Sequence, residues 1–347
     1  MKKNIFKLIV SFFIIVNIIL FTDRITISAY NTLMLWFNTV IPSLFPFMII
    51  SSWLDFNISI TDNIADKICI KLFGIPSSLM LVFVIGLLSG YPLGAKITAE
   101  LYRRKQISKS TAQQLLSFCN NCGIVFIISA VSSSMLKDKQ AAVFFISITV
   151  FSALLTGFIH NLLFPQDNIK VIAPKTALSH TSFNSAISSA IGTILTVGSC
   201  MIFFSVISES VFSLLPLKSD ISKAFISGIF EFTRGVKLIS VLNYGNKLKY
   251  SMIACILSWG GISVHLQTAA VAYDVLIIPK YIFRKALSAV TSFITAQALY
   301  DVFFAKEIIA VSTISSPTPV VHSWALSTAL CVLLLITNKA FRHTKMG

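Results

Sequence analysis

Uncharged, apolar runs recur along most of the chain and are separated by short polar segments. Each run is longer than the roughly 20 residues that a helix needs to cross the hydrocarbon core of a bilayer. The runs cover residues 25–54, 72–95, 110–136, 140–166, 176–208, 250–273 and 308–338. Together with a run at 5–21 and more polar segments at 225–242 and 286–300, they predict an all-α polytopic transmembrane protein with about eight to ten membrane elements.

Several runs contain residues that interrupt a membrane helix. Pro92 cannot donate a backbone hydrogen bond, and the glycines beside it permit a turn. The pair Asn120 and Asn121 is a poor interior for a lipid-facing helix, because each side-chain amide needs partners. The Gly260–Gly261 pair likewise weakens the run that contains it. The pattern therefore predicts broken or re-entrant helices.

Two stretches of the chain repeat each other at an offset of 141 residues. The offset aligns Gly94 with Gly235 and Lys96 with Lys237, and residues 85–117 share seven identities in 33 positions with their counterparts. Secondary transporters are commonly built from two such repeats around a central site of interrupted helices. The repeat therefore predicts two related halves and favours transport.

The repeat and the polar intervals predict four segments. Residues 1–27 form an N-terminal membrane helix, 28–164 the first transmembrane repeat, 165–182 a polar, proline-containing linker, and 183–347 the second repeat. The N-terminus also resembles a signal peptide, but an acidic and a basic residue follow its apolar run in place of a small-residue cleavage site. We therefore expect an uncleaved first helix.

Composition and charge agree with a membrane location. Apolar residues make up 55% of the chain and charged residues 12%, about half the share usual in soluble domains. The net charge of +15 comes from lysines and arginines in short loops, which is the bias that orients helices toward the cytoplasm. We count Lys280, Arg284 and Lys285 among these loop cations. The lipid bilayer is the expected partner, and nucleic acid is not.

The charge bias does not select one topology. The basic loop 96–109 faces the cytoplasm if residues 25–54 form a re-entrant hairpin broken near Pro42 and Pro46, and it faces outside if they cross once. The polar stretch 95–116 is amphipathic, and we expect it at the membrane interface with its apolar side chains in lipid. Those side chains are Ile97, Leu101 and Leu115.

Four clusters carry the polar chemistry at membrane depth, where ionisable residues are costly and usually functional. The predicted substrate-binding residues are Ser89, Tyr91, Lys96, Asn120, Asn121, Glu231, Arg234, Lys237, Trp259, His265 and Gln267. Broken helices at these clusters would aim backbone N–H groups at an anion. The alternatives are an ordinary interfacial lysine at Lys96 and helix–helix hydrogen bonding by the asparagines.

Two of these residues have a structural explanation of equal weight. Glu231 and Arg234 stand one helical turn apart, so they would neutralise each other in a local pair. His265 would carry protons near neutral pH, although a neutral, hydrogen-bonded histidine is the commoner case. Proton coupling and facilitated diffusion both stay open.

The sequence offers little for catalysis. It holds no metalloprotease, hydrolase or phosphate-loop motif, and Cys119 and Cys122 have neither a second pair nor a βαβ context. We therefore expect no enzyme activity, no cofactor and no metal ion, and we interpret the six cysteines as buried structural thiols.

Taken together, the four clusters resemble the YlbJ family of sporulation integral membrane proteins, also called SpoVV-like, which carry a nucleoside-recognition Gate domain. The resemblance covers nearly the whole chain in motif order. It rests on the stretches 89–96 (SGYPLGAK), 118–123 (FCNNCG), 228–235 (GxxExTxG) and 260–267 (GGxSVHxQ). One departure is Ile124, where the family pattern has proline, so the break at this point relies on asparagine and glycine.

The resemblance implies transport of dipicolinic acid across the outer forespore membrane during sporulation. Dipicolinate is a flat dianion, so its path needs cations, hydrogen-bond donors and aromatic faces. By residue type, charge would come from Lys96, Arg234 and Lys237, hydrogen bonds from the two asparagines and Gln267, and stacking from Tyr91 and Trp259. Two alternatives remain: a nucleoside or other metabolite carrier, and a non-transporting membrane scaffold for spore assembly.

Overall fold

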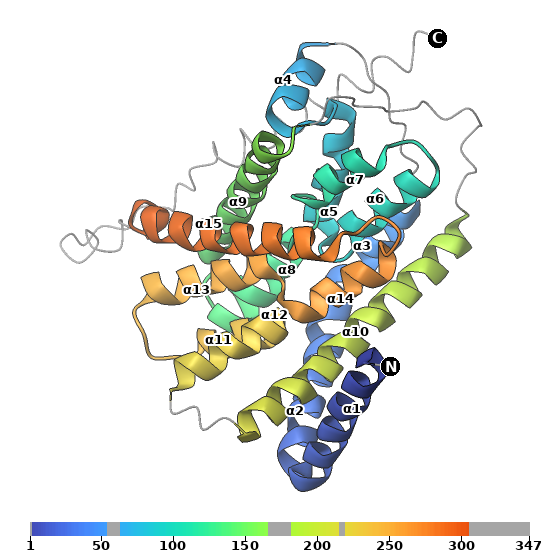
Figure 1. Cartoon of the computed structure of the whole chain (residues 1–347). Coiled ribbons are helices and arrows are strands. Elements are labelled where there is room, and N and C mark those ends of the chain that lie inside the picture. The colour runs from blue at the N-terminus through green and yellow to red at the C-terminus, as the bar shows by residue number, and fades with distance from the viewer. Residues whose placement is uncertain (1, 54–62, 166–181, 215–218, 305–347) are drawn as a thin grey trace, which may run out of the picture. The chain divides into compact units, whose positions relative to one another are not determined.

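The protein is helical throughout the part that its computed structural model describes, residues 2–53, 63–165, 182–214 and 219–304 (Figure 1). No strand occurs within these ranges. Residues 1–300 group into one compact unit, and residues 301–347, most of them outside the described ranges, into another. The prediction of an all-α membrane protein is confirmed.

Five helices in the described ranges are long and apolar enough to cross a membrane. They are Thr22–Trp53, Ala141–Leu163, Phe183–Ser213, Asn246–Val271 and Ile278–Phe304. The pair Ile64–Phe73 and Ser77–Ser89, bent by 70°, would make a sixth. Other apolar runs fold as shorter half-helices, which is why the predicted elements outnumber the full spans. The run 308–338 and most of the linker 165–182 lie outside the described residues.

The helix Thr22–Trp53 continues without turning back and is long enough to cross a membrane, so the re-entrant hairpin considered for residues 25–54 is wrong. It follows α1 (Lys2–Leu20) and consists of α2 (Thr22–Leu35), a π-helical turn η1 (Trp36–Val40) and α3 (Ile41–Trp53). The wider π-helical turn ends at Val40, two residues before Pro42, and it accommodates the missing backbone donor without breaking the helix.

This helix packs antiparallel to α10 (Phe183–Leu214). Trp53, at its end, stacks edge-on against Phe183 at the start of α10, with ring centroids 5.5 Å apart. Further along, the indole of Trp36 lies against Gly198, where an added Cβ would be 2.4 Å from a ring atom. Since early residues of one helix meet late residues of the other, the two long helices run in opposite directions.

The order of elements repeats after each long helix. Shifted by 141 residues, the end of α5 at Ser89 coincides with the end of α11 at Phe230, and the end of α9 at Leu163 with that of α15 at Phe304. The first half contains α4 (Ile64–Phe73), η2 (Ser77–Leu79), α5 (Met80–Ser89), α6 (Leu93–Arg103), α7 (Lys109–Leu116), α8 (Ile124–Phe126), η3 (Ile127–Leu136) and α9 (Ala141–Leu163). The second contains α11 (Asp220–Phe230), α12 (Phe232–Ser240), α13 (Asn246–Trp259), α14 (Gly261–Val271) and α15 (Ile278–Phe304).

Two helical hairpins, α5–α6 and α11–α12, occupy equivalent positions in the halves, and glycines let their backbones approach closely. A Cβ added at Gly94 would lie 2.2 Å from the carbonyl oxygen of Cys119. One added at Gly235 would lie 2.3 Å from the Cα of Gly228 on the opposite arm of its hairpin. The aligned glycines Gly94 and Gly235 therefore permit close backbone packing in both halves.

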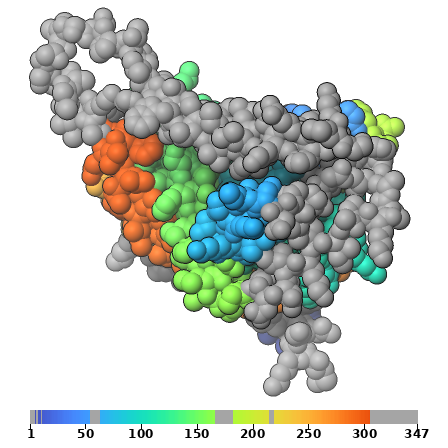
Figure 2. Space-filling view, turned by 90° about the horizontal axis from the view of Figure 1, so that it is seen from above, coloured from blue at the N-terminus to red at the C-terminus, as the bar shows by residue number. Residues whose placement is uncertain are grey.

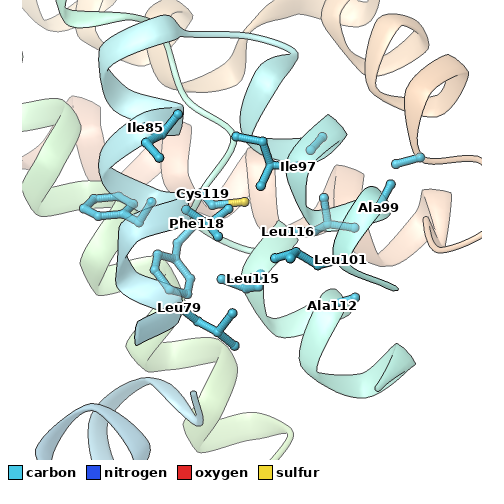
Figure 3. Packing of buried hydrophobic residues seen from close by; sticks show 14 of the residues in the cluster. Leu79, Ile85, Ile97, Ala99, Leu101, Ala112, Leu115, Leu116, Phe118 and Cys119 are labelled. Carbon is cyan, nitrogen blue, oxygen red and sulfur yellow. The ribbon is translucent and has the colours of Figure 1, made fainter. Parts of the chain in front are cut away.

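The amphipathic segment 95–116 is buried in protein and does not lie in lipid, contrary to the prediction. Ile97, Leu101 and Leu115 are 6%, 4% and 0% exposed, and they join one apolar core between α5, α6 and α7 (Figure 3). The segment folds back at residues 104–108, so the apolar faces of its two helices meet each other. The apolar side chains of the segment are therefore buried by contact between the two helices and not by lipid.

Large apolar side chains remain exposed along the outer helices. Leu8 of α1 is 70% exposed, Leu195 of α10 52% and Ile294 of α15 60%. In Figure 2, α4 (blue) lies beside α9 (green), in agreement with their packing contacts. Extensive exposed apolar surface is unfavourable in water and natural against lipid, which supports an integral membrane protein.

Candidate functional site

The tips of the two hairpins meet the breaks of two interrupted helices. Each tip packs backbone to backbone on the break that follows it in the chain. A Cβ added at Gly90, at the first tip, would lie 2.8 Å from the amide nitrogen of Gly123. One added at Gly261 would lie 3.0 Å from both the carbonyl oxygen of Phe230 and the amide nitrogen of Phe232, at the second tip. The predicted helix breaks are therefore present, including the one that lacks a proline at Ile124.

A small pocket lies where these four interruptions converge between the two long helices. Its cavity volume is only about 20 Å³. That is room for one or two waters, so the site is closed to a larger ligand in this conformation. Its lining residues are Val40, Leu44, Gly90, Tyr91, Cys122, Gly123, Phe126, Val197, Met201, Phe232, Thr233, Val264 and Gln267.

Tyr91 links the two halves across this pocket. Its hydroxyl donates to the carbonyl oxygen of Leu257 at 3.1 Å, just before the break between α13 and α14. Its ring meets the edge of Phe232 with centroids 5.9 Å apart, and Phe232 in turn meets Phe126 at 5.5 Å. The predicted aromatic surface at Tyr91 is thus part of the pocket wall and includes two phenylalanines that the sequence did not single out.

Lys285, which we had counted among the loop cations, is buried inside the protein with 2% exposure. Its ammonium donates to the hydroxyl of Tyr91 at 3.0 Å and to the carbonyl oxygen of Asn120 at 3.1 Å, and it lies 5.0 Å from the centroid of the Tyr91 ring. Its neighbour Arg284 is also buried and donates to the carbonyl oxygen of Gln113 at 2.7 Å. The sequence does hold a signal: Pro279 is typical of a first helical turn, which sets Lys285 almost two turns inside α15.

The two asparagines of the first break have different environments. The amide of Asn120 donates to the Thr268 hydroxyl at 2.9 Å and to the Tyr281 hydroxyl at 2.8 Å, both in the second half, while its Oδ1 is buried without a partner among the described residues. Asn121 donates to the carbonyl oxygen of Phe118 three residues earlier. Asn120 therefore joins the halves, and Asn121 stabilises the local turn.

The predicted side-chain pair of Glu231 and Arg234 does not form. The Glu231 carboxylate is fully buried and caps α12, accepting from the amide nitrogens of Thr233 at 3.0 Å and Arg234 at 2.7 Å. The guanidinium of Arg234 instead pairs with Glu209 of α10 at 2.6 Å. The reason is local: the chain is extended at Glu231, so the carboxylate turns toward the helix N-terminus.

The two aligned lysines have different surroundings. The Lys96 ammonium is half-buried and donates to Ser189 Oγ at 2.5 Å and to Thr193 Oγ1 at 3.1 Å, both on α10. Lys237 is exposed on α12. Neither lysine lines the pocket, and the same is true of Arg234.

The remaining predicted residues lie around the breaks. Gln267 is 2% exposed and lines the pocket. Trp259 Nε1 donates to the carbonyl oxygen of Ile229 at 3.0 Å, and Nε2 of the buried His265 lies 3.0 Å from the carbonyl oxygen of Trp259. Ser89 is buried at the end of α5. The indole and imidazole thus satisfy backbone carbonyls freed by the helix ends, a structural role outside the pocket.

Comparison with known proteins agrees with this architecture. The chain is 28% identical over 320 residues to the sporulation integral membrane protein YlbJ of Bacillus subtilis (strain 168), covering 80% of this chain and 78% of that protein. This is a YlbJ-like membrane protein. No protein-family model matches the chain, and no solved structure matches it. The Gate-domain part of the resemblance stays a prediction.

In this YlbJ-like chain, an ion pair outside the spanning helices ties the first hairpin to the second half. Arg103, at the end of α6, donates to both carboxylate oxygens of Asp274 at 2.9 Å and to the carbonyl oxygen of Val271 at 2.8 Å. The hydrogen bond from Arg103 lowers the pKa of the Asp274 carboxyl, and the same bond raises the pKa of Arg103. Both side chains are partly exposed, so the pair fixes geometry more than it stabilises the fold.

Proposed function

We propose that the protein is a membrane carrier that moves a small organic anion by alternating access. The observation that carries this proposal is the closed pocket at the junction of two hairpin tips and two helix breaks, in two halves whose long helices run antiparallel. Inverted repeats with interrupted helices around a central site are typical of secondary transporters. A scaffold would gain little from buried cations and unwound backbone at this depth.

A row of residues that winds around α10 supports a carrier mechanism in particular. Its residues at four-residue intervals contact, in order, Lys96, the pocket and Arg234. These residues are Ser189, Thr193, Val197, Met201, Ser205 and Glu209. The stripe is about 30 Å long at 1.5 Å per residue, close to the thickness of the hydrocarbon core. The pocket therefore lies between two polar contacts set near opposite faces of the membrane.

We infer that these two contacts are the gates. Lys96 ties the α5–α6 hairpin to one half of α10 through hydroxyl groups. Arg234 ties the α11–α12 hairpin to the other half through Glu209, and to Ser28 of α2 at 2.6 Å. Release of one contact at a time would open the pocket to one side of the membrane. With both contacts formed, the pocket is closed to a substrate, in agreement with its small volume.

Dipicolinic acid is the substrate that we favour, with the outer forespore membrane as the location. The B. subtilis relative is a sporulation integral membrane protein, which supports a sporulation context. Tyr91, Phe126 and Phe232 line the pocket and suit a planar aromatic ring. The pocket also faces the N-terminal ends of α8, which continues into η3, and of α14, and such ends favour anions; the N-terminus of α12 is already capped by the Glu231 carboxylate.

Uptake of labelled dipicolinate into liposomes that contain the purified protein tests the proposal. Val197→Trp fills the pocket and should abolish saturable uptake, because Val197 is buried and lines the site. Leu195→Trp, two residues away on the exposed face of the same helix, is the matched control and should transport normally. Saturable uptake of a nucleoside in place of dipicolinate would favour the metabolite carrier. A folded protein that carries neither compound would favour the scaffold.

A further inference from the structure

Lys285 carries a buried charge whose partners are neutral. The two acceptors of its ammonium are a tyrosine hydroxyl and a backbone carbonyl, at 3.0 and 3.1 Å. Among the described residues, no carboxylate forms an ion pair with it, whereas the gate cation Arg234 has Glu209. A cation at this depth without a counter-ion is costly, so its presence calls for a negative partner that the described part of the chain does not supply.

The Tyr91 side chain is the wall between this ammonium and the pocket. One part of the residue lines the pocket, together with Cys122. Its ring also covers Lys285, whose ammonium lies 5.0 Å from the ring centroid. A rotation of this single side chain would therefore expose the ammonium to a ligand in the pocket. The glycine next to it, Gly90, has a φ of 77°, which lets the backbone turn at the tip of the hairpin.

A second unsatisfied group belongs to Asn120. Its backbone carbonyl accepts from Lys285, and its side-chain Oδ1 is buried without a partner in the described part of the chain. Asn120 is 1% exposed, so solvent does not reach it freely. Buried polar atoms are nearly always hydrogen-bonded in native structures, and the exceptions mark sites that take a ligand or an ordered water. The orphaned oxygen therefore belongs to the residue whose backbone carbonyl accepts from Lys285.

The internal repeat shows that the cation is specific to one half. The residue 141 positions before Lys285 is Phe144, in α9, which is fully buried and packs against Phe145 with ring centroids 5.4 Å apart. The equivalent position in the first half is therefore filled by an apolar side chain. A structural requirement common to both halves does not explain the lysine.

We propose that Lys285 is the counter-ion for a carboxylate of the transported substrate. In the protein without substrate, the Tyr91 hydroxyl occupies the position of this carboxylate. The carboxylate displaces the Tyr91 hydroxyl from the ammonium, and the Tyr91 ring remains as a stacking face for a planar acid. The substrate class is a planar aromatic carboxylate, and an uncharged analogue of the same shape binds much more weakly. This inference rests on the proposed function and assigns recognition to a residue distinct from the gates.

Calorimetric titration of the detergent-purified protein with dipicolinate and with its uncharged dimethyl ester tests this assignment. Wild-type protein should bind the acid and discriminate against the ester. Lys285→Met should weaken binding of the acid by about 10- to 100-fold, the loss expected for a charge-assisted hydrogen bond, and should equalise acid and ester. Lys280→Met is the matched control, since it removes an exposed charge from the same helix and should change nothing. The melting temperature of Lys285→Met should be kept or raised, because an unpaired buried charge is lost.

The outcomes separate this inference from the proposed function. If Lys285→Met binds the acid as wild type does, while Val197→Trp abolishes binding, the carrier stands and the role of Lys285 is wrong. If the wild type binds a nucleoside but no carboxylate, both the proposed anionic substrate and the proposed role of Lys285 are wrong. Tyr91→Phe provides an independent test that keeps the lysine: removal of the competing hydroxyl should preserve or tighten binding of the acid. Markedly weaker binding of the acid to Tyr91→Phe would show that the Tyr91 hydroxyl does not occupy the carboxylate position.

Discussion

Addition of a single methyl group at Gly94 should destabilise the protein and disable the site. The Cβ of alanine would lie 2.2 Å from the carbonyl oxygen of Cys119 and 2.9 Å from its carbonyl carbon, and both atoms belong to the backbone. Ordinary van der Waals contact begins near 3.4 Å, so α6 and the first break must separate by about 1.2 Å. Overpacking of this kind lowers the free energy of unfolding by about 1–3 kcal/mol. The better helix propensity of alanine offsets about 1 kcal/mol of this loss.

The consequence reaches the pocket because the displaced backbone is part of the site. Residue 120 follows Cys119, and its carbonyl oxygen accepts from Lys285. We therefore expect Gly94→Ala to lower the melting temperature in detergent and to reduce dipicolinate uptake more than protein abundance.

Gly192→Ala is the matched control for this substitution. Gly192 lies in α10 with no atom within 4 Å of an added Cβ, so the same substitution should stabilise the helix by about 0.5–1 kcal/mol. The two variants thus have effects of opposite sign. A melting temperature for Gly94→Ala equal to or above that of wild type would refute the close backbone packing.

Three further predictions concern the charged contacts. A double-mutant cycle of Arg234→Met and Glu209→Gln should give a coupling free energy of about 1–3 kcal/mol in thermal unfolding, and the variants should show a marked loss of dipicolinate uptake. Additive effects of the two substitutions on stability would exclude the gate pair. Glu231→Ala should lower stability by about 0.5–2 kcal/mol through loss of the α12 cap, with Glu231→Gln intermediate, and equal melting temperatures would contradict the capping role. Because the Asp274 pKa is lower in the folded state, its contribution is present above the unfolded value near 3.9 and disappears as the pH falls through the folded pKa. Asp274→Asn should therefore lower the melting temperature slightly at pH 6, and this difference should shrink as the pH falls below the unfolded value and through the folded pKa.

The predicted and observed structures agree best where backbone chemistry alone decides. Pro92, the asparagine pair and the two glycines at 260–261 each interrupt a helix in the structure as predicted. The alignment of Gly94 with Gly235 indicated equivalent hairpins, and both glycines do permit a close backbone approach. These properties follow from a missing donor, a missing Cβ or an unsatisfied amide, which act in the same way in any tertiary context.

Two of the errors concern side-chain partners. A pair of Arg234 with its helical neighbour Glu231 was one of two interpretations of equal weight, but Arg234 reaches Glu209, 25 residues earlier in the chain. Lys285 was grouped with exposed loop cations and is among the most deeply buried side chains. In both cases the spacing along the chain gave no information about the helix that would pack opposite.

The amino-acid sequence by itself determined that this protein is a helical membrane protein, that its halves are related, and where its helices break, because apolar run length and backbone conformation are local properties. Only the tertiary structure decided which polar groups meet. The two long helices pack antiparallel, and this packing brings the hairpin tips to one pocket and sets Lys96 and Arg234 on opposite sides of it. The physical reason is that a buried charge takes its partner from whichever element packs against it, and that choice depends on the whole fold.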